Sequence, residues 1–380
     1  MQYRHFGKID FKPSLLGFGT MRLPILHGDN KQINEPEAIR MIRQAIDQGV
    51  NYVDTAYGYH GGQSELVTGK ALLDGYREKV MLATKNPTYL LKSADHWDEL
   101  LEEQLQKLQV PCIDFYLQHT LDKELWSVAK EHKVWERAEA AKKAGKIKYY
   151  GFSFHDDYEV FEDILNSYDW DFCQIQLNYL DTEHQAGLKG LQAAAAKGLG
   201  VIIMEPLQGG RLANLPEDIR DMLTKAAVQR TPVEWALRFL ADRPEVSTVL
   251  SGMSTMEHVK DNLRICSAHD MQPGCMTEQE KQLLQEVSDF WHSKINIGCT
   301  ACGYCMPCPS GVDIPGVFAA WNVHASATPG SVQRARKMYR ELVEKQDDAS
   351  FCVECGACET VCPQHLPIIE SLKRARSVLE

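Results

Sequence analysis

The chain has 380 residues, enough to bury one large core or two smaller ones, and its apolar content of 44% and charged content of 24% are ordinary for a globular protein. Its net charge of -11, without a long basic tract, argues against a nucleic-acid partner. The N-terminal segment lacks the apolar core of a signal peptide, and no apolar stretch is long enough to span a bilayer, so we expect a cytoplasmic protein with no membrane partner.

An amphipathic helix followed by a short apolar strand recurs along the chain from about residue 36. A strand at Leu15–Thr20 precedes this series, and a short hairpin is expected at Tyr3–Lys12. The helices are expected at Ala38–Gln48, Ser64–Leu73, Asp95–Gln109, Val134–Ala144, Tyr158–Asn166, Leu188–Lys197, Val233–Leu240 and Met256–Leu263. The strands that follow the first seven of them are expected at Val50–Asp54, Lys79–Thr84, Ile113–Gln118, Ile147–Gly151, Phe172–Leu177, Gly200–Met204 and Val246–Leu250.

This alternation predicts an α/β fold made of parallel β-α units. Eight strands over roughly 250–290 residues favour a closed (β/α)8 TIM barrel over an open doubly wound sheet. The first strand is not followed by G-x-G-x-x-G, which weakens a dinucleotide-binding Rossmann interpretation. The pattern stops near Ile297, so we expect the barrel to occupy residues 1–295 and a mainly helical domain to occupy residues 296–380, with helical sequence at Ile314–Lys345 and Ile368–Val378.

Eight of the twelve cysteines form two tight runs in this C-terminal part, each followed by a proline. The first run has three gaps of two residues; the second has two gaps of two residues and one of three, the spacing of bacterial two-cluster ferredoxins. Two structural zinc sites are the alternative, but consecutive gaps of two residues pack the ligands too densely for typical zinc sites. The sequence therefore predicts two 4Fe–4S clusters, and the metal ligands are Cys299, Cys302, Cys305, Cys308, Cys352, Cys355, Cys358 and Cys362.

The resemblance to two-cluster ferredoxins also implies how the ligands are shared, because there the fourth cysteine of each run binds the other cluster. One cluster would then use Cys299, Cys302, Cys305 and Cys362, and the other would use Cys352, Cys355, Cys358 and Cys308. The first run departs from the usual spacing just before Cys308. The helical sequence between the runs resembles the helical type of ferredoxin-like domain that is appended to larger oxidoreductases.

Four polar residues lie at or just past three successive predicted strand ends in the barrel: Asp54, Tyr59, Lys85 and His119. The carboxyl ends of barrel strands share one face, and that face holds the active site. We therefore expect these four side chains to converge.

The segments around these residues resemble the aldo-keto reductase family. Asp54-Thr55-Ala56-x-x-Tyr59 with Ser64-Glu65 resembles the signature of the family, and similar later blocks are Ala83-Thr84-Lys85, Asp114–His119, Tyr150–Ser153 and Gln174–Gln176. The match runs from about Leu16 to Asn262, and with the cysteine runs appended the chain resembles the iron–sulfur branch of the family.

This resemblance implies an oxidoreductase that reduces a small-molecule carbonyl, or oxidises an alcohol, with NAD(P)H. Tyr59 would donate the proton as general acid, and the ammonium of Lys85 would lower its pKa from the ordinary value of about 10. Asp54 would hold Lys85 in an ion pair, and His119 would orient or polarise the substrate oxygen.

The resemblance also implies the cofactor contacts, with the nicotinamide carboxamide near Ser153 and Gln174. Phe154 stands where the family usually has Asn, and no fixed cation occupies the positions that grip the NADP 2′-phosphate, so NAD and NADP both stay open. Backbone amides at Gly252 can still cradle a pyrophosphate. The implied contacts are Gly19, Thr20, Met21, Ser153, Gln174, Pro206, Leu207, Gly252, Glu257, His258 and Asn262.

The two halves of the sequence suggest different electron chemistry, because nicotinamide passes a hydride and iron–sulfur clusters pass single electrons. The clusters are structural in one interpretation; in a second, a flavin links the barrel to the clusters and to an electron-transfer partner; in a third, the protein is a non-enzymatic iron or oxygen sensor. The complete set of four barrel residues favours an enzyme. The loops give no distinctive substrate clamp. Two interpretations of His60, His155 and Arg211 are open, residues that line the mouth of the barrel or surface residues of loops, and the second is favoured.

Overall fold

The computed structural model describes residues 1–325 and 330–380 and divides into two compact units. The first unit comprises Met1–Pro206 and Val233–Met276, and the second comprises Leu207–Pro232 and Thr277–Glu380. The single domain boundary expected near residue 295 stays a prediction. The two compact units are divided differently, because the segment after the seventh barrel strand and the helix after Met276 belong to the same unit as the C-terminal residues.

Eight parallel strands in the first unit close into a barrel, which confirms the predicted fold class. The strands are β1 (Leu16–Gly19), β4 (Tyr52–Asp54), β5 (Met81–Asn86), β6 (Ile113–Leu121), β7 (Ile147–Phe154), β8 (Phe172–Gln176), β9 (Gly200–Met204) and β10 (Val246–Gly252). Around the barrel the order is β1-β10-β9-β8-β7-β6-β5-β4, so each strand neighbours the next in sequence and β1 pairs with both β4 and β10. In this register Gly19 lies opposite Asp54 on one side and Gly252 on the other, at the carboxyl end of the barrel.

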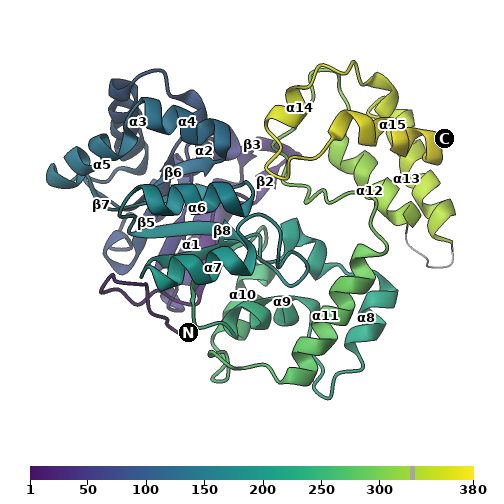
Figure 1. Cartoon of the computed structure of the whole chain (residues 1–380), viewed down its shortest axis with the longest axis horizontal. Helices are drawn as coiled ribbons and strands as arrows, with labels where there is room; N and C mark the ends of the chain where they lie inside the picture. Colours follow the sequence, from purple (N-terminus) through teal and green to yellow (C-terminus); the bar gives the residue numbers. More distant parts are fainter. Residues whose placement is uncertain (326–329) are drawn as a thin grey trace. The chain divides into compact units, whose positions relative to one another are not determined.

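Helices follow the strands on the outside of the barrel, as Figure 1 shows for α3, α6 and α7. The helices of this unit are α1 (Glu35–Asp47), α2 (Gln63–Ala71), α3 (Ala94–Leu108), α4 (Lys123–Glu131), α5 (Val134–Lys143), α6 (Tyr158–Ser167), α7 (Gly187–Ala196), α9 (Pro232–Ala241) and α10 (Met256–Cys266).

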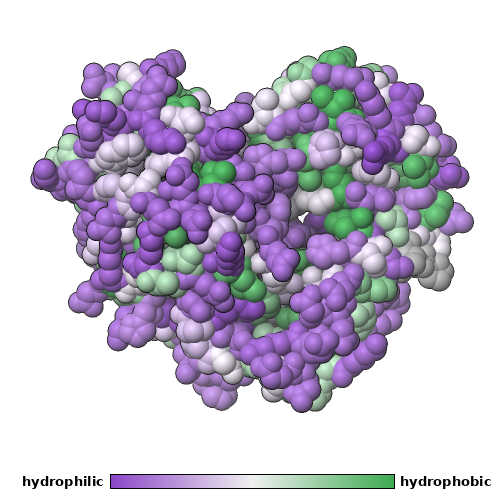
Figure 2. Space-filling view, in the orientation of Figure 1, coloured by the Kyte–Doolittle hydropathy of each residue, from purple (hydrophilic) through white to green (hydrophobic). Residues whose placement is uncertain are grey.

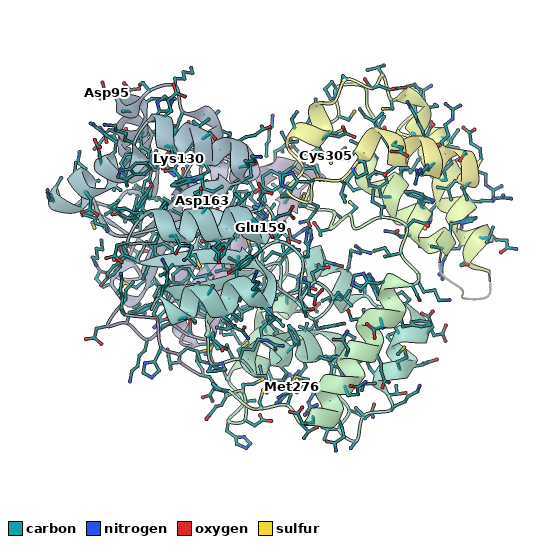
Figure 3. The ribbon with its side chains drawn as sticks, viewed as in Figure 1. Asp95, Lys130, Glu159, Asp163, Met276 and Cys305 are labelled. Carbon is teal, nitrogen blue, oxygen red and sulfur yellow. The ribbon has the colours of Figure 1, made fainter. Side chains whose placement is uncertain are left out.

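Two elements of this unit were absent from the prediction: α4 and an antiparallel hairpin, β2 (Ile25–Leu26) with β3 (Asp29–Ile33). Helix α4 is fixed to α6 by Trp126, whose Nε1 donates to Asp163 Oδ2 at 2.8 Å, and by Lys130, whose Nζ lies 3.9 Å from the same oxygen (Figure 3).

The N-terminal segment closes the amino end of the barrel. Phe6 is fully buried and packs with Phe115, Phe172 and other barrel residues. A Cβ on Gly200 would lie 2.3 Å from the Phe6 ring, so β9 must begin with a glycine to admit it. The expected hairpin appears as two isolated antiparallel bridges, Tyr3 to Ser14 and Phe6 to Ile9.

The second unit is helical, as predicted. Its helices are α8 (Glu217–Leu223), α11 (Glu278–His292), α12 (Ile314–Ala325), α13 (Ser331–Lys345), α14 (Ala357–Thr360) and α15 (Ile368–Leu379). The continuous helical sequence expected at Ile314–Lys345 corresponds to α12 and α13, and its residues 326–329 lie outside the described residues. None of the helices in the described parts of the chain has the length and apolar character needed to cross a membrane.

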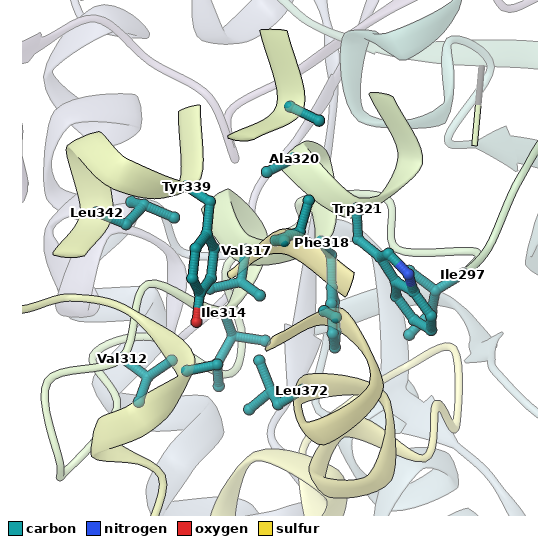
Figure 4. Packing of buried hydrophobic residues seen from close by; sticks show 14 of the residues in the cluster. Ile297, Val312, Ile314, Val317, Phe318, Ala320, Trp321, Tyr339, Leu342 and Leu372 are labelled. Atoms are coloured by element: carbon teal, nitrogen blue, oxygen red, sulfur yellow. The ribbon is translucent and has the colours of Figure 1, made fainter. Parts of the chain in front are cut away.

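One hydrophobic core holds the C-terminal helices together (Figure 4). Phe318 and Trp321 of α12, Tyr339 of α13 and Leu372 of α15 are among its buried members. Six cysteines of the two runs pack against this core: Cys299, Cys305, Cys308, Cys352, Cys358 and Cys362. Anything that the cysteines bind therefore joins the core of the C-terminal helices.

Candidate functional site

The four expected catalytic residues come together at the carboxyl end of the barrel. Asp54 ends β4, Lys85 lies in β5, His119 lies in β6, and Tyr59 begins the 3-10 helix η1 (Tyr59–Gly62). The Lys85 ammonium donates to Asp54 Oδ1 at 2.5 Å and approaches the Tyr59 hydroxyl at 3.5 Å. The Tyr59 and His119 rings lie 6.2 Å apart, edge to face. An ammonium, a phenol and an imidazole therefore share one small site.

The ion pair of Asp54 and Lys85 is almost completely buried, with 2% and 1% exposure. Burial raises the pKa of Asp54 although Lys85 opposes this, and burial lowers the pKa of Lys85 although Asp54 opposes that. Further hydrogen bonds compensate for the lost hydration: Gln174 Nε2 donates to Asp54 Oδ2 at 3.3 Å, and Lys85 donates to the Thr55 carbonyl at 2.8 Å. The pair therefore holds the ammonium in one position beside Tyr59.

A buried polar network supports the backbone of Lys85. Thr84 Oγ1 and Gln104 Nε2 donate to Glu65 Oε1 at 2.7 and 2.5 Å, and Gln104 also donates to the Lys85 carbonyl at 3.0 Å. The Tyr116 hydroxyl donates to Gln104 Oε1 at 2.7 Å. The sequence indicated Glu65 only as part of the family signature. In the structure its carboxylate connects α2 with α3 and β5 through hydrogen bonds.

His119 is a neutral imidazole at pH 7. It is 4% exposed, and burial, with the nearby charge of Lys85 and then His155, lowers its pKa well below the usual value. Among the residues that the structure describes, its Nδ1 has no hydrogen-bond partner. A neutral ring beside Tyr59 can donate one hydrogen bond to a substrate oxygen without adding charge.

Replacing His119 by glutamine is expected to flatten the pH dependence of stability. The pKa of His119 is lowered by folding, so below about pH 6.5 the unfolded chain binds a proton that the folded chain does not. As the pH falls below about 6.5, the free energy of unfolding of the wild type should decrease by up to about 1.4 kcal/mol per pH unit, until folded His119 is protonated too. Denaturant unfolding between pH 7.5 and 5.5 measures this. The free energy of unfolding of the variant must improve relative to the wild type as the pH falls; a constant difference would contradict the assignment.

Several expected cofactor residues line the same barrel end. Thr20 donates from its backbone N and its Oγ1 to the Asp54 carbonyl at 2.9 and 3.0 Å. Ser153 lies opposite Gln174 in the β7–β8 register, and its Oγ accepts from the Thr120 backbone N at 2.8 Å. Gly19 lies between Asp54 and Gly252 in the barrel register, with Met21 shortly after it in the chain.

The residues expected at the adenosine end surround the start of α10. Asn262 Nδ2 donates to Ser251 Oγ at 2.9 Å and so ties α10 to β10. Glu257 and His258 lie exposed in the first turn of α10, and His258 Nδ1 accepts from the Ser254 backbone N at 3.4 Å. Pro206 ends the first stretch of the first unit, whereas Leu207 is the first residue of the second unit.

Phe154, which stands where the family usually has Asn, packs on Phe161 of α6 with ring centroids 5.1 Å apart. It is fully buried there. This position therefore supplies no amide to a carboxamide.

His60 and His155 are not surface residues, so that interpretation was wrong. They are 3% and 9% exposed. His60 Nε2 accepts from the Leu23 backbone N at 3.2 Å, and its Nδ1 is 2.8 Å from the Asn30 carbonyl, so Nδ1 carries the proton. This neutral imidazole fastens the β2–β3 hairpin and the loop after β1 to the turn that carries Tyr59. Its role was invisible in the sequence because both partners are backbone atoms of distant loops.

The eight cysteines of the two runs line two small cavities in the second unit. Cys299, Cys302, Cys305 and Cys362 line one, and the other is lined by the remaining four, Cys308, Cys352, Cys355 and Cys358. Within the described residues no His, Cys, Asp and Glu side chains group tightly enough for a single metal ion. Four cysteine thiolates around each cavity match the ligand set of a four-iron cluster.

The barrel and its site define a class of protein, a TIM-barrel oxidoreductase with an appended cluster domain. Residues 15–274 match the aldo/keto reductase family and residues 298–366 match the 4Fe–4S dicluster domain. The chain belongs to the aldo/keto reductase family and is an NAD(P)-dependent oxidoreductase carrying a 4Fe–4S dicluster domain.

Individual relatives agree with this assignment. The uncharacterized oxidoreductase YrpG of Bacillus subtilis (strain 168) is 26% identical over 306 residues, which cover 70% of this chain and 90% of the relative. L-galactose dehydrogenase of Arabidopsis thaliana is 28% identical over 287 residues, 69% of this chain and 87% of the relative. Among solved structures, the holo form of the aldo-keto reductase AKR11C1 from Bacillus halodurans is similar with a TM-score of 0.63 and 28% identity, covering 76% of this chain and 96% of that one.

Proposed function

We propose that the protein reduces a small-molecule carbonyl, or oxidises the corresponding alcohol, with Tyr59 as the general acid or base. One observation carries this proposal: the buried Lys85 ammonium lies between the Asp54 carboxylate and the Tyr59 hydroxyl, at 2.5 and 3.5 Å. Burying a lysine costs desolvation free energy that a purely structural role seldom offsets, whereas a proton-transfer site uses the buried charge.

The residues divide the work of carbonyl reduction among them. Bound nicotinamide supplies the hydride. Tyr59 gives its hydroxyl proton to the carbonyl oxygen, and the fixed Lys85 ammonium stabilises the tyrosinate that forms. Neutral His119 donates a hydrogen bond to the same oxygen and so stabilises the charge that develops there. In alcohol oxidation the same groups act in reverse order.

The clusters are proposed to be structural. Six of their eight cysteine ligands pack against the hydrophobic core of the C-terminal helices. A helical domain of this size gains stability from such crosslinks. Two clusters would act as buried crosslinks that connect α12, α15 and the two cysteine loops.

A second candidate, a reductase that passes electrons through a flavin to the clusters, is favoured by a cavity of about 550 Å³ in the second unit. Cys299, Trp291 and three basic side chains line it, among them Arg211. The Arg211 guanidinium lies over the Trp291 ring at 4.9 Å and donates to the Cys299 carbonyl at 2.8 Å. This volume, an aromatic face and positive charge suit a planar anionic cofactor beside one cluster.

The second candidate also requires a surface where an electron-transfer partner binds. Phe351, Val353 and Val361, close to three cysteines of the second run, are 40%, 69% and 47% exposed. Figure 2 shows hydrophobic surface in green among the C-terminal helices. Exposed apolar side chains beside a redox centre suit a transient docking surface.

The two candidates predict different fates for the hydride. Anaerobically purified holoprotein is mixed with 4-deuterated NADH or NADPH and a panel of aldehydes and ketones. The first candidate predicts deuterium on the carbinol carbon of the product and clusters that stay in their resting oxidation state by electron paramagnetic resonance. The second candidate would replace the first if the protein released flavin and if NADH or NADPH reduced the clusters without any carbonyl present.

A further inference from the structure

The cavity of about 550 Å³ in the second unit is lined only by residues of that unit. Its walls come from the 3-10 helix η4 (Gln208–Ala213), from α8, α12 and α13, and from the end of α11 and the segment after it. Leu215, Ile219 and Val323 are among its apolar members. A cavity of this size with mainly apolar walls and a few polar groups is typical of a small-molecule site.

The charged side chains of the wall are mostly cations. Arg211 in η4, Lys294 after α11 and Arg334 in α13 line the cavity, and Asp218 is the one carboxylate among the lining residues described. In the described part of the chain neither Lys294 nor Arg334 forms an ion pair. This local positive charge contrasts with the net charge of -11 of the whole chain. An anionic ligand would therefore gain charge-assisted hydrogen bonds here.

The indole of Trp291, in the same wall, is a second sign of a ligand. Trp291 is 7% exposed, and among the residues that the structure describes its Nε1 has no hydrogen-bond acceptor. A buried donor without an acceptor is rare in native proteins and indicates an acceptor from outside the chain, such as a ligand or an ordered water.

The side-chain amides of the wall already bind the backbone. Asn322 Oδ1 accepts from the backbone N of Asn296 and Ile297 at 2.9 and 3.0 Å, and its Nδ2 donates to the Ile297 carbonyl at 2.8 Å. Asn214 Nδ2 donates to the Gly210 carbonyl at 3.5 Å. The polar edge of a flavin ring would need several further partners when buried, whereas an acid with an apolar body needs only cations and an apolar wall.

We propose that this cavity binds a small organic acid, with one carboxylate and an apolar body, and that the bound acid protects the first cysteine run. The link is Arg211, whose Nη1 donates to the Cys299 carbonyl at 2.8 Å and whose guanidinium lies over the Trp291 ring. Cys299 and Ala301 also line the cavity, so the acid would cover the start of this run. The inference goes beyond the proposed function, because it uses no residue of the barrel site.

Octanoate binding to the anaerobically purified holoprotein tests the ligand class, with dissociation constants from isothermal titration calorimetry. 1-Octanol has the same body without the charge, and acetate has the charge without the body. The dissociation constant of octanol should be at least about tenfold higher than that of octanoate, because octanol lacks charge-assisted hydrogen bonds. That of acetate should be at least about 100-fold higher, because acetate buries almost no apolar surface.

Variants of the wall separate the charge from the volume. K294A combined with R334A should weaken octanoate about tenfold and change octanol by less than about twofold. K337A is the matched control, because Lys337 is exposed on the same helix as Arg334 and does not line the cavity. Ala319→Phe places a ring in the cavity from an exposed position on α12, so it should abolish the binding of both octanoate and octanol.

Protection of the first run is measured by the loss of absorbance near 400 nm in air. With octanoate at ten times its dissociation constant, at least one phase of this loss should slow about tenfold if the acid must leave before the loop opens. Ala319→Phe should lose the effect. Equal rates with and without octanoate would overturn the protection.

The remaining outcomes decide the occupant of the cavity. A wild-type protein that does not bind octanoate, or binds octanol equally well, would overturn the organic-acid assignment. Flavin mononucleotide that displaces octanoate and binds more tightly would give the cavity to the flavin of the second candidate. None of these measurements follows the deuterium transfer that tests carbonyl reduction, so the inference and the proposed function can fail separately.

Discussion

Replacing Tyr59 by phenylalanine is expected to lower kcat for carbonyl reduction by about 10³-fold, within the range that one general acid contributes. Phenylalanine keeps the ring that packs edge to face with His119 and removes only the hydroxyl near Lys85. Cofactor affinity and melting temperature should change little, because Tyr59 is half-buried and its bond to Lys85 is long at 3.5 Å. Stopped-flow reduction, nicotinamide titration and thermal unfolding measure the three quantities.

Tyr57→Phe is the matched control for this variant. It removes a hydroxyl two residues away, which donates to Glu103 Oε2 at 3.1 Å. Its kcat should stay within about threefold of the wild type. If Tyr59→Phe reduced carbonyls as fast as Tyr57→Phe, the proton would come from another group and the proposed mechanism would be wrong.

The barrel was predictable because each strand is a short apolar run followed by polar residues and a helix. The misses have local causes. Strand β6 continues to Leu121, three residues past its expected end, and the Asp122 side chain then caps α4 by accepting from the Leu125 backbone N at 2.7 Å. The hairpin β2–β3 is mostly exposed and polar, so it carries no alternation of buried residues by which to recognise it.

The four central residues of the site were predictable for a geometric reason: parallel strands place their carboxyl ends on one face, so strand-end residues must meet. His60 was not, because its importance depends on what lies beside it, the backbone atoms of Leu23 and Asn30. Sequence spacing does not encode these contacts.

If the two runs share their cysteines between the two clusters, alanine substitutions of these cysteines should have large effects on the iron content and the melting temperature. In the structure Cys362 joins the cavity of the first run, and Cys308 joins that of the second. The shortened gap before Cys308 therefore still lets it reach the other run. A cluster in each cavity would bind cysteines of both runs, so loss of one ligand should loosen both cysteine loops.

Pairs of alanine substitutions distinguish shared ligands from separate ones. The wild type should hold about eight irons per chain, four in each cluster. If ligands are shared, Cys299→Ala with Cys362→Ala damages a single cluster and leaves about four irons. Cys355→Ala with Cys362→Ala damages both clusters and leaves almost none. If each run held its own cluster, these two results would be exchanged.

The iron content of anaerobically purified variants, with absorbance near 400 nm, measures these outcomes. Cys112→Ala is the control, since Cys112 lies in the barrel unit outside both runs and should leave the iron content unchanged. The melting temperatures of the variants should follow the order of their iron contents, because Cys362 and Cys299 pack on the core that contains Phe318 and Leu372. The pair that loses both clusters should therefore unfold the C-terminal helices at a lower temperature than the pair that loses one. Equal melting temperatures at unequal iron contents would show that the clusters do not stabilise this core, and would remove the main support for a structural role.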